Sequence, residues 1–284
     1  EAGNQYVFGD AVQTGSIKSQ LENPDLKWET TTELNVGLDF GFLNNRITGS
    51  FEYFHKVVSD LLAFRKLNSL MEVSTIADNI GATQSTGYEF SLNTVNLTGP
   101  FKWNTTLNIS SYNDRWKERN PDVVLAPYEK EDAPIRAIYG CVSDGILQIG
   151  ETPPASMPDL LPGQMKVKDL NGFDPNDGSK LLGHPDAADR IYLGSTDPKV
   201  IIGFGNMFEY KNFDLNIFFY GMFGQYVANS NRAKYGPSGC EYILQRQNYS
   251  KEVLERWTPD NPTNKFPSGF YSAYYGGDDW LVEK

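Results

Sequence analysis

The chain has 284 residues, of which 39% are hydrophobic, and its formal net charge is -11 at pH 7. It contains no run of about 18 apolar residues, so the sequence excludes a transmembrane helix. A transmembrane β-barrel is still allowed, because the strands of a barrel alternate apolar and polar residues. The acidic balance and the absence of a Lys/Arg cluster exclude nucleic acid as an expected partner.

The two cysteines, Cys141 and Cys240, are far apart in the sequence and belong to no CxxC motif. Neither a zinc site nor a redox centre is therefore expected, and the two thiols can be paired or unpaired. Residues 1–5 lack a Met and a signal-peptide pattern, and residues 279–284 end without a turn signal. We expect both ends to be cut from a longer protein.

Alternation with a period of two is the clearest pattern in the chain, and it first occurs over residues 32–42. The apolar residues of this segment are Leu34, Val36, Leu38, Phe40 and Phe42. Polar residues and glycines stand between them, which predicts a strand with one apolar face and one wet face. Residues 43–45 predict a tight turn, because Asn tolerates the left-handed backbone conformation.

The same alternation recurs along the chain and predicts three hairpins with short turns. The six expected strands lie near residues 32–42, 46–56, 84–94, 101–112, 199–210 and 213–224. Each segment has about ten residues, which is the length that a tilted barrel strand needs to cross a membrane. Aromatic residues gather near the strand ends, as in the interfacial girdles of membrane barrels.

The connections between the hairpins are long, above all residues 113–197 and 225–284. Such loops are uncommon in compact soluble domains, whereas outer-membrane barrels combine short periplasmic turns with long extracellular loops. The predicted fold class is therefore all-β, an antiparallel transmembrane β-barrel segment of about six strands. A soluble β-sandwich is the alternative, but its strands are usually only about five or six residues long.

Six segments resemble the SusC/RagA family of TonB-dependent outer-membrane transporters, and they occur in the order found in that family. They are Asn23–Glu29 with Leu34–Phe40 and Leu43–Ile47, Asn79–Gly81 with Gly87–Glu89, Asp169–Gly172, Asp189–Arg190, Tyr210–Leu215 and Trp257–Pro262. Together they extend over nearly the whole chain. A single segment of this kind would only suggest the family, whereas six segments in the family's order are specific for it.

The resemblance implies that residues 1–284 belong to the barrel domain of a TonB-dependent receptor, a barrel of about 22 strands with a plugged lumen. It implies a multi-pass protein of the bacterial outer membrane, in contact with lipid. The implied partners are a SusD-like surface lipoprotein and TonB, which acts through the plug. Six strands cannot close such a barrel, so we expect a fragment that lacks the plug and the final strands.

Oxygen-bearing side chains recur over residues 169–178 in a pattern that resembles a calcium loop. Phe173 stands where the family has an acidic residue, and an insertion separates this loop from Asp189. The candidate calcium ligands are Asp169, Asn171, Asp174 and Asp189. The alternative is an Asx-rich loop held by hydrogen bonds between side chains and backbone. No other cofactor is expected.

The predicted loops carry aromatic residues whose ring faces could stack on sugars or anchor a protein partner. The candidate ligand-binding residues are Trp116, Tyr139, Tyr235, Tyr271, Tyr274 and Trp280. Alternatively, these rings pack the loops against one another. His55 and His184 belong to no catalytic motif, and no GxSxG, HExxH or phosphate-binding loop occurs, so an enzyme is not expected.

Three classes of function are consistent with these patterns. The resemblance favours a TonB-dependent importer of nutrients, with oligosaccharides as the first expected cargo and oligopeptides as the second. A passive porin or an adhesive surface barrel would share the alternation and the loop asymmetry, and a plug domain would discriminate against both. A soluble, β-rich carbohydrate-binding module is the third class, and detergent dependence during purification would discriminate against it.

Overall fold

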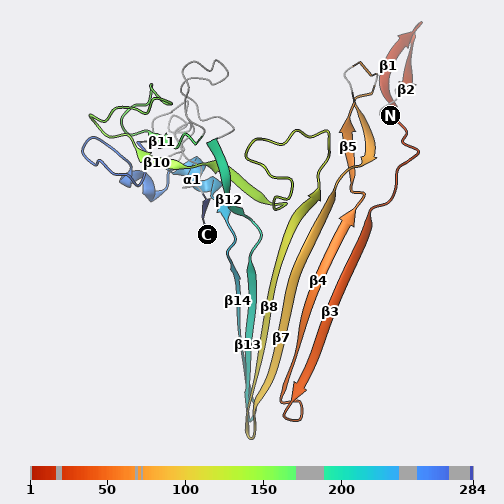
Figure 1. The fold of residues 1–284 in the computed structure, drawn as a ribbon, viewed down its shortest axis with the longest axis vertical. Helices are drawn as coiled ribbons and strands as arrows, with labels where there is room; N and C mark the ends of the chain where they lie inside the picture. The colour runs from red at the N-terminus through yellow and green to blue at the C-terminus, as the bar shows by residue number, and fades with distance from the viewer. Residues whose placement is uncertain are drawn as a thin grey trace.

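The computed structural model describes most of the chain. The described residues are 2–16, 21–67, 70–71, 73–170, 189–236, 248–268 and 282–283. Within these ranges, no helix has the length and hydropathy needed to cross a bilayer. The fold is dominated by one long antiparallel sheet with a layer of smaller elements at one end (Figure 1).

The main sheet contains six strands in the order β14-β13-β8-β7-β4-β3. Their bounds are Thr30–Phe42 (β3), Ile47–Ser59 (β4), Ala82–Thr98 (β7), Phe101–Glu118 (β8), Val200–Tyr210 (β13) and Phe213–Phe223 (β14). All neighbouring strands are antiparallel. The predicted all-β, antiparallel architecture is confirmed, and each strand overlaps one of the six alternating segments.

Strands β7 and β8 are longer than the ranges 84–94 and 101–112 that the alternation predicts. Their pairing continues to Ala82 and Glu118 at one end. The hydrophobic alternation stops before these residues, because beyond the apolar zone most residues on both faces of the ribbon are polar. Backbone hydrogen bonding alone extends the strands there, and side-chain patterns do not report it.

The hairpin turns lie together at the narrow end of the sheet (Figure 1). Leu43, Asn44 and Asn45 have φ values of 54°, 54° and 63°, and Lys211 has a φ of 54°. Asn adopts this left-handed region readily, whereas Leu and Lys do so at a cost. The predicted turn conformation at Asn44 and Asn45 is thus present, and it extends to Leu43.

The smaller elements form strand pairs and short helices outside the main sheet. They are β1 (Ala2–Phe8) with β2 (Ala11–Ser16), β5 (Leu62–Lys66) with β6 (Thr75–Asn79), β9 (Ala137–Cys141) with β12 (Arg190–Ser195), β10 (Ser143–Ile146) with β11 (Met165–Val167), β15 (Val227–Ala228) with β16 (Val282–Glu283), α1 (Ser230–Tyr235) and the 3₁₀ helix η3 (Lys251–Glu255). The long connections are therefore folded over much of their described length.

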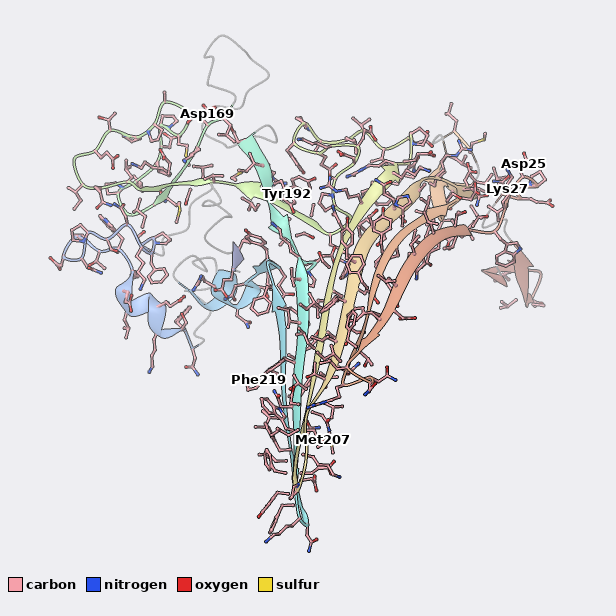
Figure 2. All side chains as sticks on the ribbon, turned by 60° about the horizontal axis from the view of Figure 1, so that its bottom comes forward. Asp25, Lys27, Asp169, Tyr192, Met207 and Phe219 are labelled. Atoms are coloured by element: carbon pink, nitrogen blue, oxygen red, sulfur yellow. The ribbon has the colours of Figure 1, made fainter. Side chains whose placement is uncertain are left out.

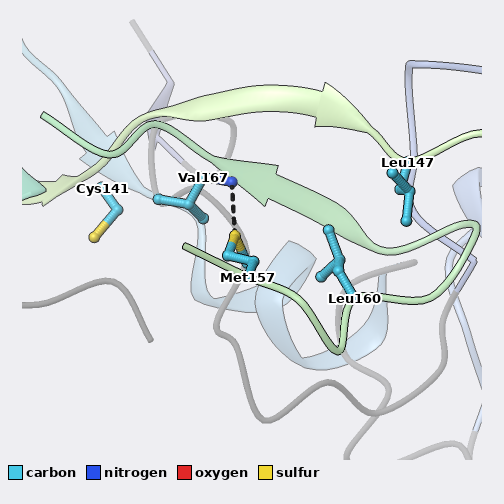
Figure 3. Close-up of a cluster of buried hydrophobic side chains, with 5 residues drawn as sticks. All are labelled: Cys141, Leu147, Met157, Leu160 and Val167. Atoms are coloured by element: carbon cyan, nitrogen blue, oxygen red, sulfur yellow. Dashed lines mark hydrogen bonds between the residues drawn. The ribbon is translucent and has the colours of Figure 1, made fainter. Parts of the chain in front are cut away.

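A buried hydrophobic core lies in this loop layer rather than in the main sheet. It is formed by Cys141, Leu147, Met157, Leu160 and Val167, which are at most 7% exposed (Figure 3). The backbone N–H of Val167 donates to Met157 Sδ at 3.4 Å. The loops thus stabilise themselves as a small soluble unit would, by removing apolar side chains from water.

Two of the segments that carry the family resemblance are in direct contact. The Asn79 side chain accepts from the backbone N–H of Lys27 at 2.7 Å and donates to the Lys27 carbonyl at 2.8 Å. Asn23 Nδ2 donates to the carbonyl of Ala77 at 2.9 Å. These side chains fasten the segment before β3 to the β5–β6 hairpin, because each satisfies backbone groups that no strand pairs.

Gly49 allows a close approach between strands β4, β3 and β7. An added Cβ there would lie 2.6 Å from Phe40 Cζ and would press on the carbonyl oxygen of Ser91. The Phe40 ring therefore covers the space above the glycine, which is a known way of stabilising glycine within a sheet. Only glycine fits at this position, because no side-chain rotamer can relieve a clash between an added Cβ and the Ser91 carbonyl.

We predict that Gly49→Ala lowers the free energy of unfolding of the complete receptor by about 1–3 kcal/mol through overpacking. Gly99→Ala is the matched control, since an added Cβ at Gly99 meets no atom within 4 Å. Urea denaturation of the two variants in lipid vesicles provides the comparison. Equal stabilities would contradict the close approach at Gly49.

Candidate functional site

One face of the main sheet is predominantly apolar. Cross-strand pairing places Leu38, Phe51, Phe90, Ile109 and Ile202 in one row from β3 to β13. Several apolar residues on this face are widely exposed, with Leu38 at 65% and Phe219 at 62%. Apolar surface of this extent is rare on a soluble monomer and marks contact with a partner or a membrane.

The opposite face of the sheet is mainly polar. Asp39, Ser50, Ser91, Asn108 and Gly203 form the neighbouring row across the same strands. The hydroxyls of Ser50 and Ser91 are 2.8 Å apart and share a hydrogen bond. A groove of about 350 Å³ runs along this face. Such side chains are suited to an aqueous interior rather than to lipid.

Strand β14 departs from strict alternation, because Phe218 lies on the mainly polar face. Its ring is 3.4 Å from the positions that a Cβ would take at Gly203 and at Gly205. The ring thus covers two glycines of β13, as Phe40 covers Gly49 on the other face. Packing over these glycines explains why an aromatic residue lies on the polar face of the sheet.

Aromatic rings gather at the turn end of the sheet. The ring centroids of Phe208 lie 6.0 Å from Phe101 and 5.8 Å from Trp103. Trp103 Nε1 donates to Asn206 Oδ1 at 2.9 Å, so its polar atom is satisfied. Rings with one polar tip are typical of the boundary between hydrocarbon and water. The predicted girdle residues at this end therefore lie together.

A cluster of three tyrosines lies where the sheet enters the loop layer. The Tyr139 ring centroid is 5.0 Å from that of Tyr128 and 6.1 Å from that of Tyr192. Arg190 lies over the Tyr128 ring at 5.8 Å. Figure 2 shows Tyr192 at this junction. Burial raises the pKa of Tyr139 and of Tyr192, so both phenols stay neutral hydrogen-bonding groups at neutral pH.

Of the six aromatic residues predicted to bind ligand, Tyr139 is part of this tyrosine cluster. Trp116 lies at the loop end of β8, where the Arg119 guanidinium is 5.4 Å from its ring centroid. The side chains of the other four lie outside the described residues: Tyr235, Tyr271, Tyr274 and Trp280. The sequence does not predict Tyr192, because it belongs to no alternating segment or motif. Only the pairing of β12 with β9 places it beside Tyr139.

The predicted calcium loop lies partly outside the described residues, since Asn171 and Asp174 are not described. Asp189 is 4% exposed, and its Oδ1 accepts from the backbone N–H of Leu170 at 2.8 Å. This carboxylate therefore fastens the two described ends of the loop to each other. Asp169 is exposed in the loop layer (Figure 2). In the described part of the chain, no three acidic, His or Cys side chains are placed to hold a metal.

The geometry defines a class of protein. A long antiparallel sheet has one apolar and one polar face, short turns and an aromatic girdle at one end, and folded loops at the other. This is the architecture of a wall segment of an outer-membrane β-barrel.

Comparison with known proteins gives the family. The sequence profile described as "TonB dependent receptor-like, beta-barrel" matches residues 2–156, which is more than half of the chain, so the chain belongs to this family. It is 31% identical over 279 residues to the TonB-dependent receptor P3 of Formosa agariphila, covering 92% of this chain and 26% of that receptor. It is 29% identical to the TonB-dependent receptor SusC of Bacteroides thetaiotaomicron, covering 88% of this chain and 25% of SusC.

A solved structure has the same fold. The structure of the RagAB peptide transporter superposes with a TM-score of 0.74 at 20% sequence identity, covering all of this chain and 30% of that one. The predicted resemblance to SusC/RagA receptors, the barrel fold class and the bacterial outer-membrane location are confirmed. The chain spans about a quarter of the length of the curated relatives it matches.

We predict that Leu38→Arg in the complete receptor lowers its free energy of unfolding by about 2–4 kcal/mol, because the charge would enter hydrocarbon. Asp39→Arg is the matched control, since it places the same side chain one residue away on the polar face. Both variants are compared by urea denaturation in lipid vesicles. If Asp39→Arg proves the more damaging of the two, the assignment of the faces is wrong.

Proposed function

We propose that the chain forms part of the wall and outer loops of a TonB-dependent importer of nutrient oligomers. The observation that carries this proposal is the two-faced sheet, because a wall that is apolar outside and polar inside encloses a water-filled passage. Membership in a receptor-barrel family supports a transport role rather than an enzymatic one. Uptake of this kind is energised by TonB acting on the plug.

We also propose that all of residues 1–284 belong to one barrel domain. The family profile covers residues 2–156. The pairing of β13 with β8 over ten register positions, from Ile201 to Tyr210, supports extending the same wall to β13 and β14. Both edges of the six-stranded sheet, β3 and β14, then pair with further strands of the receptor, because an open edge is not tolerated in lipid.

Oligosaccharides are the proposed cargo. Tyr128, Tyr139 and Tyr192 offer ring faces and neutral hydroxyls at the junction of wall and loops, and such groups suit stacking on sugar rings. Trp116, Tyr235, Tyr271, Tyr274 and Trp280 complete the proposed set of ligand-binding aromatics. Oligopeptides are the second candidate, because the structurally similar RagAB protein is a peptide transporter.

A SusD-like lipoprotein is the proposed partner at the loop end. Among the described loop residues after β8, four apolar side chains are more than 60% exposed, which suits a protein interface. They are Val124 (93%), Leu254 (82%), Ile149 (64%) and Leu161 (61%). A lipoprotein that covers these residues would enclose cargo between itself and the barrel mouth.

We predict that bacteria expressing the complete receptor take up a fluorescent neutral oligosaccharide, and that deletion of tonB abolishes the uptake. Tyr139→Ala is expected to reduce uptake severalfold, because a stacked ring contributes about 0.5–1.5 kcal/mol. Tyr139→Phe is the matched control and should retain most of the uptake, since it keeps the ring. Uptake that continues without TonB would instead support a passive porin.

We further propose that Asp169, Asn171, Asp174 and Asp189 hold a calcium ion that orders residues 169–189. Hard oxygen ligands of this kind are those that Ca²⁺ prefers. We expect calcium to slow the proteolysis of this loop severalfold relative to EGTA, and Asp169→Ala to remove the difference. Asp169 is the residue to change, because Asp189 also holds the backbone of Leu170. Identical cleavage rates with calcium and EGTA would leave the Asx-rich loop as the correct alternative.

A further inference from the structure

A polar hollow of about 530 Å³ lies in the loop layer between α1 and η3. The described side chains that line it include Asn229, Asn231, Arg232, Asn248, Ser250 and Glu252. Tyr249 completes the described lining, and no aliphatic side chain belongs to it. The tyrosine cluster and the proposed calcium loop contribute none of these residues, so the hollow is a separate feature.

Arg232 fixes the rim of the hollow. Its Nε and Nη2 donate to the Glu252 carboxylate at 3.2 and 2.9 Å, and its Nη1 lies 3.0 Å from Glu283 Oε1. Asn229 Nδ2 donates to the same Glu283 oxygen at 2.9 Å, while Asn229 Oδ1 accepts from the Arg232 N–H. This network joins α1, η3 and β16, so the rim is held in place before any ligand arrives.

The charge of this network disfavours an ionic ligand. The hydrogen bond from Arg232 to Glu252 raises the pKa of the guanidinium, which stays charged. One positive charge is then set against the two carboxylates of Glu252 and Glu283, which leaves the group at about -1. A negative group disfavours anions, and both carboxylates already accept charge-assisted bonds from Arg232, which reduces what a cation would gain there. The remaining choice is a neutral ligand.

Other polar groups at the hollow have hydrogen-bonding capacity to spare. The exposed amides of Asn231 and Asn248 make no side-chain hydrogen bond within the described chain. Ser250 Oγ is buried and has no partner there. An amide offers both donors and an acceptor, and a hydroxyl offers one donor and two lone pairs. Because a buried hydroxyl without a partner is costly, a ligand that supplied one would gain affinity.

We propose that this hollow binds a neutral, polyhydroxylated ligand, that is, a sugar unit. Vicinal sugar hydroxyls both donate and accept, and so match Asn231 and Asn248. Ser250 lines the same hollow, and its hydroxyl has no partner in the described chain. A peptide is less well matched, because the described lining has no apolar pocket for side chains. The inference rests on the proposed function, since it gives the imported cargo a second contact on the outer loops.

The test measures binding to the complete receptor by isothermal titration calorimetry, with maltohexaose, cellohexaose and mannohexaose as neutral probes and hexaglycine as the peptide probe. The Asn231→Ala/Asn248→Ala double variant is expected to bind the preferred hexasaccharide about tenfold more weakly, as two lost neutral hydrogen bonds predict. Lys251→Ala is the matched control, because Lys251 is exposed on η3 and lies outside the lining.

Ser250→Ala separates a ligand contact from a structural role. It should weaken binding about threefold and leave thermal stability unchanged or higher, because the hydroxyl has no partner in the free protein. A lower stability with unchanged affinity would assign Ser250 to the fold alone.

The outcomes distinguish this site from the import function. If the wild type imports a hexasaccharide through TonB and the double variant binds it with unchanged affinity, the hollow is not a sugar site and the import function stands. If TonB-dependent uptake fails while the double variant still loses affinity, the hollow stands and the proposed import does not. Preference for hexaglycine, or no binding of any probe by the wild type, overturns the proposed site.

Discussion

The structure depends on one constraint: each backbone N–H and C=O of a wall in lipid has to be paired by a neighbouring strand, so that only the side chains meet the surroundings. Strands β4, β7, β8 and β13 have partners on both sides. Their alternate residues therefore face two different surroundings, as Ser50 and Phe51 of β4 do from consecutive positions. Only strands that close into a barrel can satisfy this requirement in lipid. The two unpaired edges follow from the same rule and must be covered by other strands.

A second consequence is the division of stabilising interactions between wall and loops. The sheet is one layer thick and has no buried core of its own, whereas Leu147, Met157 and Leu160 are almost fully buried in the loop layer. In an outer-membrane barrel, such a wall meets hydrocarbon on its apolar face and the polar interior on its other face. The loops instead carry their own core, and polar networks such as that of Arg232 hold their outer parts in place.

This division explains what the sequence predicts and what it does not. The six strands are predictable, because Leu34, Val36 and Leu38 repeat with the period of a β-strand. The loop core is not, since Leu147 and Met157 come together through pairings that no local period encodes. The tyrosine cluster shows the same limit: Tyr139 is an evident candidate, but only the pairing of β9 with β12 brings Tyr192 beside it. Likewise, the position of Phe218 on the polar face is explained only by the glycines of the neighbouring strand β13, over which its ring packs.

The contrast between wall and loops also indicates which residues could select a cargo. The wall requires only alternation and glycine at a few close contacts, so many sequences can build it, and the 20% identity to RagAB at a TM-score of 0.74 is consistent with this tolerance. A surface that so many sequences satisfy carries little information about cargo. Under the proposed import function, selectivity lies where side chains are fixed individually by non-local contacts. In this chain such positions are the tyrosine cluster and the rim around Arg232, both of which belong to the loop end of the wall.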